Sequence, residues 1–165
     1  EWAGIEPDVM AIAKGLGGGF PVGAFLATDA VANAMTPGTH GSTFGGNLLA
    51  MAVGNAVLDV VLAPEFLAEV SRKALRLKQS LEGLKDTHSD LVAEVRGAGL
   101  LAGLKLKGIA PADLVGAAAA EHLLVVGAAD NVVRILPPLT ATDEEIAEAT
   151  QRLSRALTRL AAKTH

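Results

Sequence analysis

The chain has 165 residues, of which 50% are hydrophobic and 19% charged, and its formal net charge is -4. This length and composition predict a folded globular protein with one domain, or one domain and part of another, and exclude a disordered chain. The 14 basic residues form no block, which argues against a nucleic-acid surface, and the lack of cysteine excludes disulfides and thiolate metal sites. Since nothing calls for an oxidising compartment, we expect a cytoplasmic protein with no nucleic-acid or membrane partner.

The first 47 residues are expected to form short elements joined by loops. A turn at Pro7 and Asp8 leads into a buried strand or a single helical turn over residues 9–13. After a glycine-rich loop, residues 22–27 have the pattern of a second short buried strand. Asp29 can cap a brief helix that ends near Met35, and residues 39–47 form a polar loop.

Two helices are expected in the middle of the chain. Asn47 is a suitable N-cap for a helix that reaches about residue 62. Pro64 opens a second helix to about residue 85, in which apolar residues recur at helical spacing. The apolar stretch over residues 48–63 falls short of the roughly 20 residues that cross a bilayer, so it indicates a buried helix.

The rest of the chain alternates strands and helices. The predicted strands cover residues 91–96, 100–107, 123–126 and 132–136, and the predicted helices cover residues 112–122 and 142–162. The first two strands should form an antiparallel pair, with Lys105 on one face and Leu104 and Leu106 on the other. This order predicts a self-contained α+β unit after a boundary near Ala63.

Lys14 is the first candidate for chemistry, because an apolar run ends at this lysine and four glycines follow it within residues 15–19. An amine becomes a nucleophile only when it loses its proton, and an apolar setting favours the uncharged form. The glycines would let a planar cofactor approach the main chain. We therefore expect an enclosed, covalently acting Lys14, and the alternative is a solvated surface lysine.

The loop GTHGSTFGGN at residues 38–47 is the second candidate. It offers the hydroxyls of Ser42 and Thr43 directly before a predicted helix N-terminus, a combination that suits a phosphate. An ordinary capped loop is the alternative. Neither glycine-rich loop has the spacing of a dinucleotide fingerprint or of a P-loop.

Arg134 is the third candidate, because it interrupts an apolar strand and is followed by two prolines. Its guanidinium could hold a substrate carboxylate, form a structural ion pair, or face outward from the strand, and the sequence leaves these possibilities open. The histidines do not cluster, so no metal site is expected. They are His40, His88, His122 and His165.

Taken together, these motifs resemble those of the class III aminotransferases. The matching runs lie at residues 4–24, 38–47, 95–100 (VRGAGL) and 133–139 (VRILPPL). The resemblance implies the C-terminal part of an α/β transferase of fold type I that depends on pyridoxal 5′-phosphate (PLP). Residues 1–62 would be a remnant of the large PLP-binding domain, and residues 63–165 a complete small α+β domain. The sequence departs from the family after Asn47, where Leu48 replaces a usual proline that is dispensable at a first helical turn.

The resemblance also implies roles for individual residues. Lys14 would form the Schiff base with PLP and then carry a proton between the substrate carbon and the cofactor. Thr43 would reach the cofactor phosphate of the partner subunit in a homodimer, Ser42 would touch the acylated substrate, and Arg134 would hold its α-carboxylate. The implied reaction moves the distal amine of N-acetylornithine to 2-oxoglutarate, as in arginine biosynthesis. Ornithine, succinylornithine and 4-aminobutyrate remain alternative amine donors.

Because the chain begins at Glu1 and not at methionine, we expect a fragment of a longer protein. In the family, the aspartate that pairs with the pyridinium nitrogen, most of the phosphate site and the ring stacked on the cofactor lie upstream of the matching segment. The resemblance therefore implies negligible turnover by these residues alone. A non-catalytic remnant, whose residues 63–165 fold and pack against partners, is the alternative from outside the enzymes.

Overall fold

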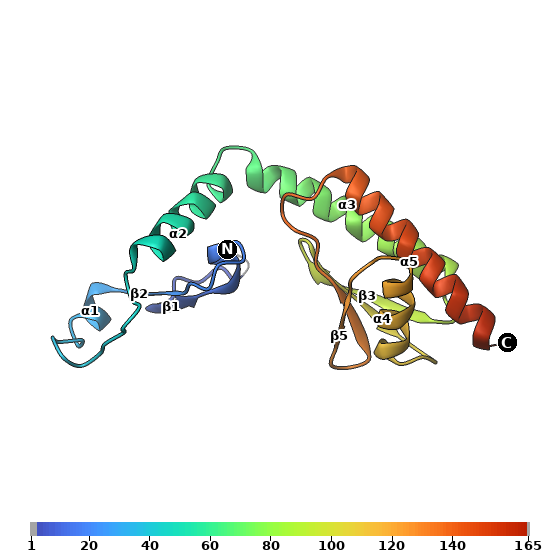
Figure 1. Cartoon of the computed structure of the whole chain (residues 1–165), viewed down its shortest axis with the longest axis horizontal. Helices are drawn as coiled ribbons and strands as arrows, with labels where there is room; N and C mark the ends of the chain where they lie inside the picture. The colour runs from blue at the N-terminus through green and yellow to red at the C-terminus, as the bar shows by residue number, and fades with distance from the viewer. Residues whose placement is uncertain (1–2, 165) are drawn as a thin grey trace. The chain divides into compact units, whose positions relative to one another are not determined.

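The computed structural model describes residues 3–164 and divides into two compact units, Glu1–Phe66 and Leu67–His165 (Figure 1). Each unit has its own set of helices and strands, and they are described in turn. The chain start at Glu1 and the last of the four histidines, His165, lie outside the described residues.

The first unit contains a two-stranded antiparallel sheet followed by helices. Strand β1 (Val9–Ile12) pairs with β2 (Ala24–Ala27), so the first segment is the strand and not the helical turn, and the second predicted strand is confirmed but begins two residues later than residue 22. The 3-10 helix η1 (Lys14–Gly17) lies between them in the chain, and α1 (Asp29–Ala32) and α2 (Leu48–Val61) follow. The prediction for α1 is wrong in detail, because Thr28 and not Asp29 is its N-cap and it ends at Ala32, before Met35. Oδ1 of Asn47 accepts the N–H of Ala50 at 2.9 Å, which confirms the predicted N-cap of α2.

Most apolar side chains of the first unit are exposed to solvent. Leu48 is 88% exposed and Phe25 57%, whereas only Gly17 and Ala50 are buried among the described residues of this unit. The expectation of buried strands and a buried helix in this part of the chain is therefore wrong. A lone hairpin and one long helix have too little surface to cover one another, so the described residues of this unit form no core of their own.

The second unit has the predicted order of strand, strand, helix, strand, strand and helix, preceded by a long helix. Helix α3 (Phe66–Thr87) is followed by a four-stranded antiparallel sheet of order β3-β4-β6-β5. The elements after α3 are β3 (Val92–Ala98), β4 (Leu101–Leu106), α4 (Pro111–Ala120), β5 (Val126–Ala128), β6 (Val132–Ile135) and α5 (Asp143–Thr164). Strands β3 and β4 pair as expected, and β5 starts three residues later than residue 123.

The core of the second unit lies between one face of the sheet and the three helices of the unit. Leu104 of β4 and Val133 of β6 are fully buried against residues such as Leu81 of α3, Leu114 of α4 and Leu157 of α5. Leu104 and Leu106 point into this core while Lys105 points the other way, which confirms the predicted alternation. The opposite face of the sheet carries the charged side chains of the strands.

Polar contacts fix how α5 begins and how it joins α3. Arg72 and Arg76 of α3 lie 2.9 and 3.0 Å from Oδ2 of Asp143. Oγ1 of Thr142 accepts the N–H of Glu145, and Oε2 of Glu145 accepts the N–H of Thr142, at 3.1 and 2.7 Å. This reciprocal capping box confirms that the terminal helix begins at the predicted place.

The helices do not provide a simple membrane span. No single helix within residues 3–164 is long and apolar enough to cross a bilayer. Helices α2 and α3 meet that requirement by length and composition only when taken together across the break between them.

Candidate active site

Lys14 is the first residue of η1, directly after β1 and Ala13. Its backbone is left-handed, with φ of 52°, a conformation that costs an ordinary residue about 1–2 kcal/mol. The side chain is exposed, so the expectation of an apolar enclosure is wrong for the described chain, because no described segment covers it. Its amine has no hydrogen-bond or ion-pair partner within residues 3–164. Lys14 is therefore free to react with a group brought from outside.

The glycines after Lys14 serve two different purposes. A Cβ at Gly17 would lie 2.7 Å from Cγ1 of Val22, and a Cβ at Gly18 would lie 3.0 Å from Cγ2 of Val57 in α2. These two glycines let the loop pack closely within the first unit, which the cofactor-approach interpretation did not anticipate. Gly19, with φ of 115°, has nothing within 4 Å of its Cβ position, so this part of the loop is open to a ligand.

Ser42 and Thr43 lie in the loop that leads into α2. Both are exposed, and neither hydroxyl has a partner in the part of the chain that the structure describes. Successive turns shape the loop: Oγ1 of Thr39 donates to the carbonyl of Thr36 at 2.7 Å, and the N–H of Gly45 donates to the carbonyl of Ser42 at 3.4 Å. The two hydroxyls can therefore donate to an anion without breaking a contact of their own.

Arg134 lies on β6, opposite Gly103 of β4 and Val126 of β5. It is exposed on the face of the sheet that points away from the helices, and its guanidinium has no hydrogen bond or ion pair within residues 3–164. Arg134 thus faces outward from the sheet and forms no structural ion pair in the described chain, and its predicted hold on a substrate carboxylate stays a prediction. Lys14, Ser42 and Thr43 belong to the first unit and Arg134 to the second.

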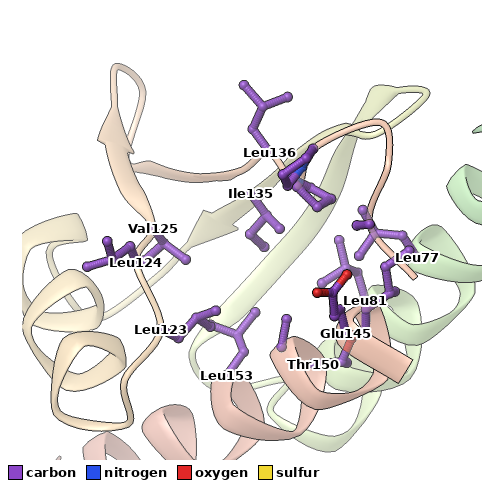
Figure 2. Close-up of a pocket in the computed structure, with 15 residues that line it drawn as sticks. Leu77, Leu81, Leu123, Leu124, Val125, Ile135, Leu136, Glu145, Thr150 and Leu153 are labelled. Carbon is purple, nitrogen blue, oxygen red and sulfur yellow. The ribbon is translucent and has the colours of Figure 1, made fainter. Parts of the chain in front are cut away.

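A cavity of about 320 Å³ lies in the second unit, next to the segment that follows Arg134 (Figure 2). Its walls are mostly apolar and come from α3, α5, the segment before β5 and the segment after β6; they include Leu81, Leu123, Ile135, Leu136 and Leu153. The two polar residues in the wall are already engaged, Glu145 with the N–H of Thr142 and Thr150 with the carbonyl of Ile146. None of the four predicted site residues lines this cavity, which suits apolar packing better than chemistry.

We expected no metal site, and the described residues can be searched for a cluster of metal-binding side chains. Within residues 3–164, no group of three or more His, Asp or Glu side chains could hold a metal ion. Nε2 of His88 lies 3.4 Å from Oγ of Ser154, and burial lowers the pKa of this histidine.

Sequence reasoning missed a cluster of charges on the face of the sheet that bears Arg134. Nη1 of Arg96 lies 2.6 Å from Oδ2 of Asp130, and Nζ of Lys105 contacts Oδ1 and the carbonyl of the same aspartate. Asp130 sits in the turn between β5 and β6, more than twenty residues after the two cations. The alternation of Glu94, Arg96 and Lys105 with apolar residues could have indicated this charged face. Nothing in the sequence pattern indicated that Asp130, in the turn, would be the partner of two of these residues.

Comparison with known proteins covers almost the whole chain. A family model described as "Aminotransferase class-III" matches residues 1–157. The acetylornithine aminotransferase of Rhodobacter capsulatus is 57% identical over 156 residues, which are 94% of this chain and 39% of that protein.

Solved structures agree with this match. The N-acetylornithine aminotransferase of Stenotrophomonas maltophilia superposes with a TM-score of 0.83 at 36% identity, over 96% of this chain and 42% of that one. The ornithine aminotransferase of Toxoplasma gondii, described with partial occupancy of PLP at its active site, superposes with a TM-score of 0.88 at 31% identity. The match covers 97% of this chain and 39% of that one. The chain therefore spans about two fifths of the length of the relatives it matches.

Proposed function

The chain belongs to the class III aminotransferases, and from this we propose that it supplies part of a PLP-dependent enzyme that moves the distal amine of N-acetylornithine to 2-oxoglutarate. Relatives named acetylornithine aminotransferase, at identities of 57% and 59% over 94% and 93% of the chain, support this substrate. We place the enzyme in the cytoplasm, as a homodimer. Ornithine, succinylornithine and 4-aminobutyrate are the competing amine donors.

The residues present fit the cofactor. PLP, when bound, supplies an aldehyde and an electron-withdrawing ring. The exposed amine of Lys14, without a partner in the described chain, can bind such an aldehyde, and the open backbone at Gly19 leaves space for a flat ring. Once the substrate amine frees it, Nζ of Lys14 would hold the proton taken from the substrate carbon.

The other predicted site residues would orient the ligands. Thr43 would donate its hydroxyl to the cofactor phosphate of the partner subunit, and Ser42 would donate to the acylated substrate. Arg134 would hold the α-carboxylate in two parallel hydrogen bonds, so that the distal amine is the one that reacts. Each of these groups is exposed and without a partner in residues 3–164, as a ligand-binding group should be before its ligand arrives.

The observation that carries the proposal is the free amine of Lys14 at the end of β1, in a left-handed backbone that an ordinary surface lysine does not need. The direct test is to mix the chain with PLP, reduce with borohydride, and map the modified lysines by mass spectrometry. We expect Lys14 to be labelled at PLP concentrations that leave the exposed Lys78 unlabelled. Lys14→Arg, which keeps the charge but removes the reactive amine, is the matched control. Equal labelling of both lysines would contradict the proposal and favour an inert remnant.

A chimera tests the activity and the substrate. This chain would replace the matching segment of the Rhodobacter capsulatus relative, and glutamate formation would be followed with each candidate amine donor. We expect the highest kcat/KM with N-acetylornithine and no activity when Lys14 is replaced by arginine. A preference for ornithine or 4-aminobutyrate would refute the substrate but not the family.

A further inference from the structure

The face of the four-stranded sheet that points away from the helices carries all the charged residues of its strands. They are Glu94 and Arg96 on β3, Lys105 on β4 and Arg134 on β6. Their shared orientation follows from pairing: Arg96 and Arg134 both lie opposite Gly103, whereas the neighbouring Leu104 points into the core. One sheet surface thus presents three cations.

Gly103 separates the two arginines. Adjacent strands lie about 4.8 Å apart, so the Cα atoms of Arg96 and Arg134 are about 10 Å apart across the intervening glycine. The methyl Cγ1 of Val132 lies over Gly103, 2.8 Å from the position that a Cβ would take there, so the two guanidinium groups could converge only above this methyl group, at the ends of their long stems. Left free, Arg96 and Arg134 would form a two-cation site suited to a dicarboxylate or a phosphate.

Asp130 prevents this convergence because its side chain pairs with Arg96, and it also pairs with Lys105. Its Oδ2 lies 2.6 Å from Nη1 of Arg96, while its Oδ1 and its carbonyl accept from Nζ of Lys105. Hydrogen bonds from Lys105 and from Arg96 lower the pKa of Asp130, so it is ionised at neutral pH. Glu94 adds a second anion, 2.9 Å from Nη2 of Arg96.

The turn between β5 and β6 holds Asp130 in place. Asp130 and Asn131 have φ of 60° and 54°, the left-handed backbone of a tight hairpin turn. Nδ2 of Asn131 donates to the carbonyls of Leu106 and Ile109 at 2.8 and 3.1 Å, which anchors the turn to the end of β4. Because Asp130 is tethered beside Arg96, it competes with a dissolved anion at a high effective concentration, of the order of mM or above.

We propose that Asp130 is a positioning residue that withholds Arg96 and Lys105 from ligands, so that this face offers Arg134 alone and takes one carboxylate per ligand. This inference rests on the proposed function for the role of Arg134. It adds a specificity: the second carboxylate of a dicarboxylic substrate such as 2-oxoglutarate must be held by groups other than Arg96 and Lys105. The carboxylate of Asp130 touches no reacting atom and acts only through the two cations.

Anion titration of the 165-residue chain tests the proposal without any enzyme activity. The Nε–H NMR signals of arginine report which guanidinium responds to acetate, with one carboxylate, or to glutarate, with two. Asp130→Asn removes the charge and keeps a residue that accepts the left-handed backbone. Asp90→Asn is the matched control, since Asp90 is an exposed aspartate of the same unit with no ion-pair or hydrogen-bond partner for its side chain in residues 3–164.

In the unsubstituted chain and in Asp90→Asn, we expect glutarate to shift Arg134 and leave Arg96 unchanged. In Asp130→Asn, the signal of Arg96 should respond as well. The affinity of the chain for glutarate should rise about fivefold or more relative to its affinity for acetate, because a second cation becomes available. The inference is wrong if Arg96 responds equally in the unsubstituted chain and in Asp130→Asn. A silent Arg134 with a newly responsive Arg96 would instead remove the proposed carboxylate role of Arg134 and retain that of Asp130.

Discussion

Replacing Gly97 by alanine should strongly destabilise the hairpin that β3 and β4 form. Gly97 has φ of 121°, and a Cβ there would lie 2.0 Å from the carbonyl oxygen of Leu101 and 2.9 Å from Cα of Ala102. Both neighbours are backbone atoms of the paired strand, so relief requires that the strands separate. A side chain in this backbone region costs about 1–3 kcal/mol, and overpacking adds about 1–3 kcal/mol more. The sum is a large part of the 5–15 kcal/mol or so that stabilises a typical domain.

Urea unfolding of the 165-residue chain, followed by circular dichroism, measures this loss. The transition reports mainly on the second unit, because the described residues of the first form no buried core. Two other glycines are controls. Gly99→Ala changes the same hairpin at φ of 59° with nothing within 4 Å, and should cost only about 1–2 kcal/mol. Gly116→Ala, in the open middle of α4, should stabilise by up to about 1 kcal/mol. A Gly97→Ala chain no less stable than Gly99→Ala would refute the steric argument.

Three further predictions concern the stability of the second unit and use the same unfolding assay. Leu104→Ala, at a fully buried position, should lower the free energy of unfolding by about 2–5 kcal/mol. Leu101→Ala, at a position 49% exposed on the same strand, should lower it by less than about 1.5 kcal/mol. Equal losses would contradict the assignment of the core face. Thr142→Ala removes the capping hydrogen bond at the start of α5 and should cost about 1 kcal/mol, with a change below about 0.3 kcal/mol counting against the capping box. The hydrogen bond from Arg155 lowers the pKa of Glu121 below its ordinary 4.5, so its stabilisation is fully present above that value and is lost as pH falls through the lowered pKa. Between about pH 6 and about pH 3 the unsubstituted chain should therefore lose more stability than Glu121→Gln, and parallel curves would show that the pair contributes nothing.

Local patterns predicted the elements of this protein well, because helix and strand periods and capping residues act over a few positions. Asn47 and Thr142 marked two helix starts that the structure confirms by hydrogen bonds. The same patterns predicted the antiparallel pair of β3 and β4 and the direction of Lys105. The start of β5 was placed too early, since residues 123–125 are apolar like a strand but line the cavity beside α5 and pair with no strand of the part of the chain that the structure describes.

The candidate site was less predictable than the elements. Lys14, Ser42, Thr43 and Arg134 could be selected from motifs, and their roles stay proposals until the labelling and titration experiments are done. What the motifs did not reveal is that Lys14 and Arg134 are both exposed and without partners in the described residues. The pairing of Asp130 with Arg96 was also invisible, because it links residues 34 positions apart.

The amino-acid sequence by itself determined the order of helices and strands, the caps and the family to which the chain belongs, because each depends on residue types at short spacings. Only the tertiary structure decided which side chains are buried, that Arg134 has no partner in the described residues, and that Asp130 pairs with Arg96 and Lys105. Burial and ion pairing depend on which distant segments pack together, and apolar periodicity does not specify the neighbour that covers a face. The exposed apolar side chains of α2 and the buried ones of α3 illustrate this difference, because the apolar stretch over residues 48–63 predicted a buried helix as firmly as helical spacing did for α3.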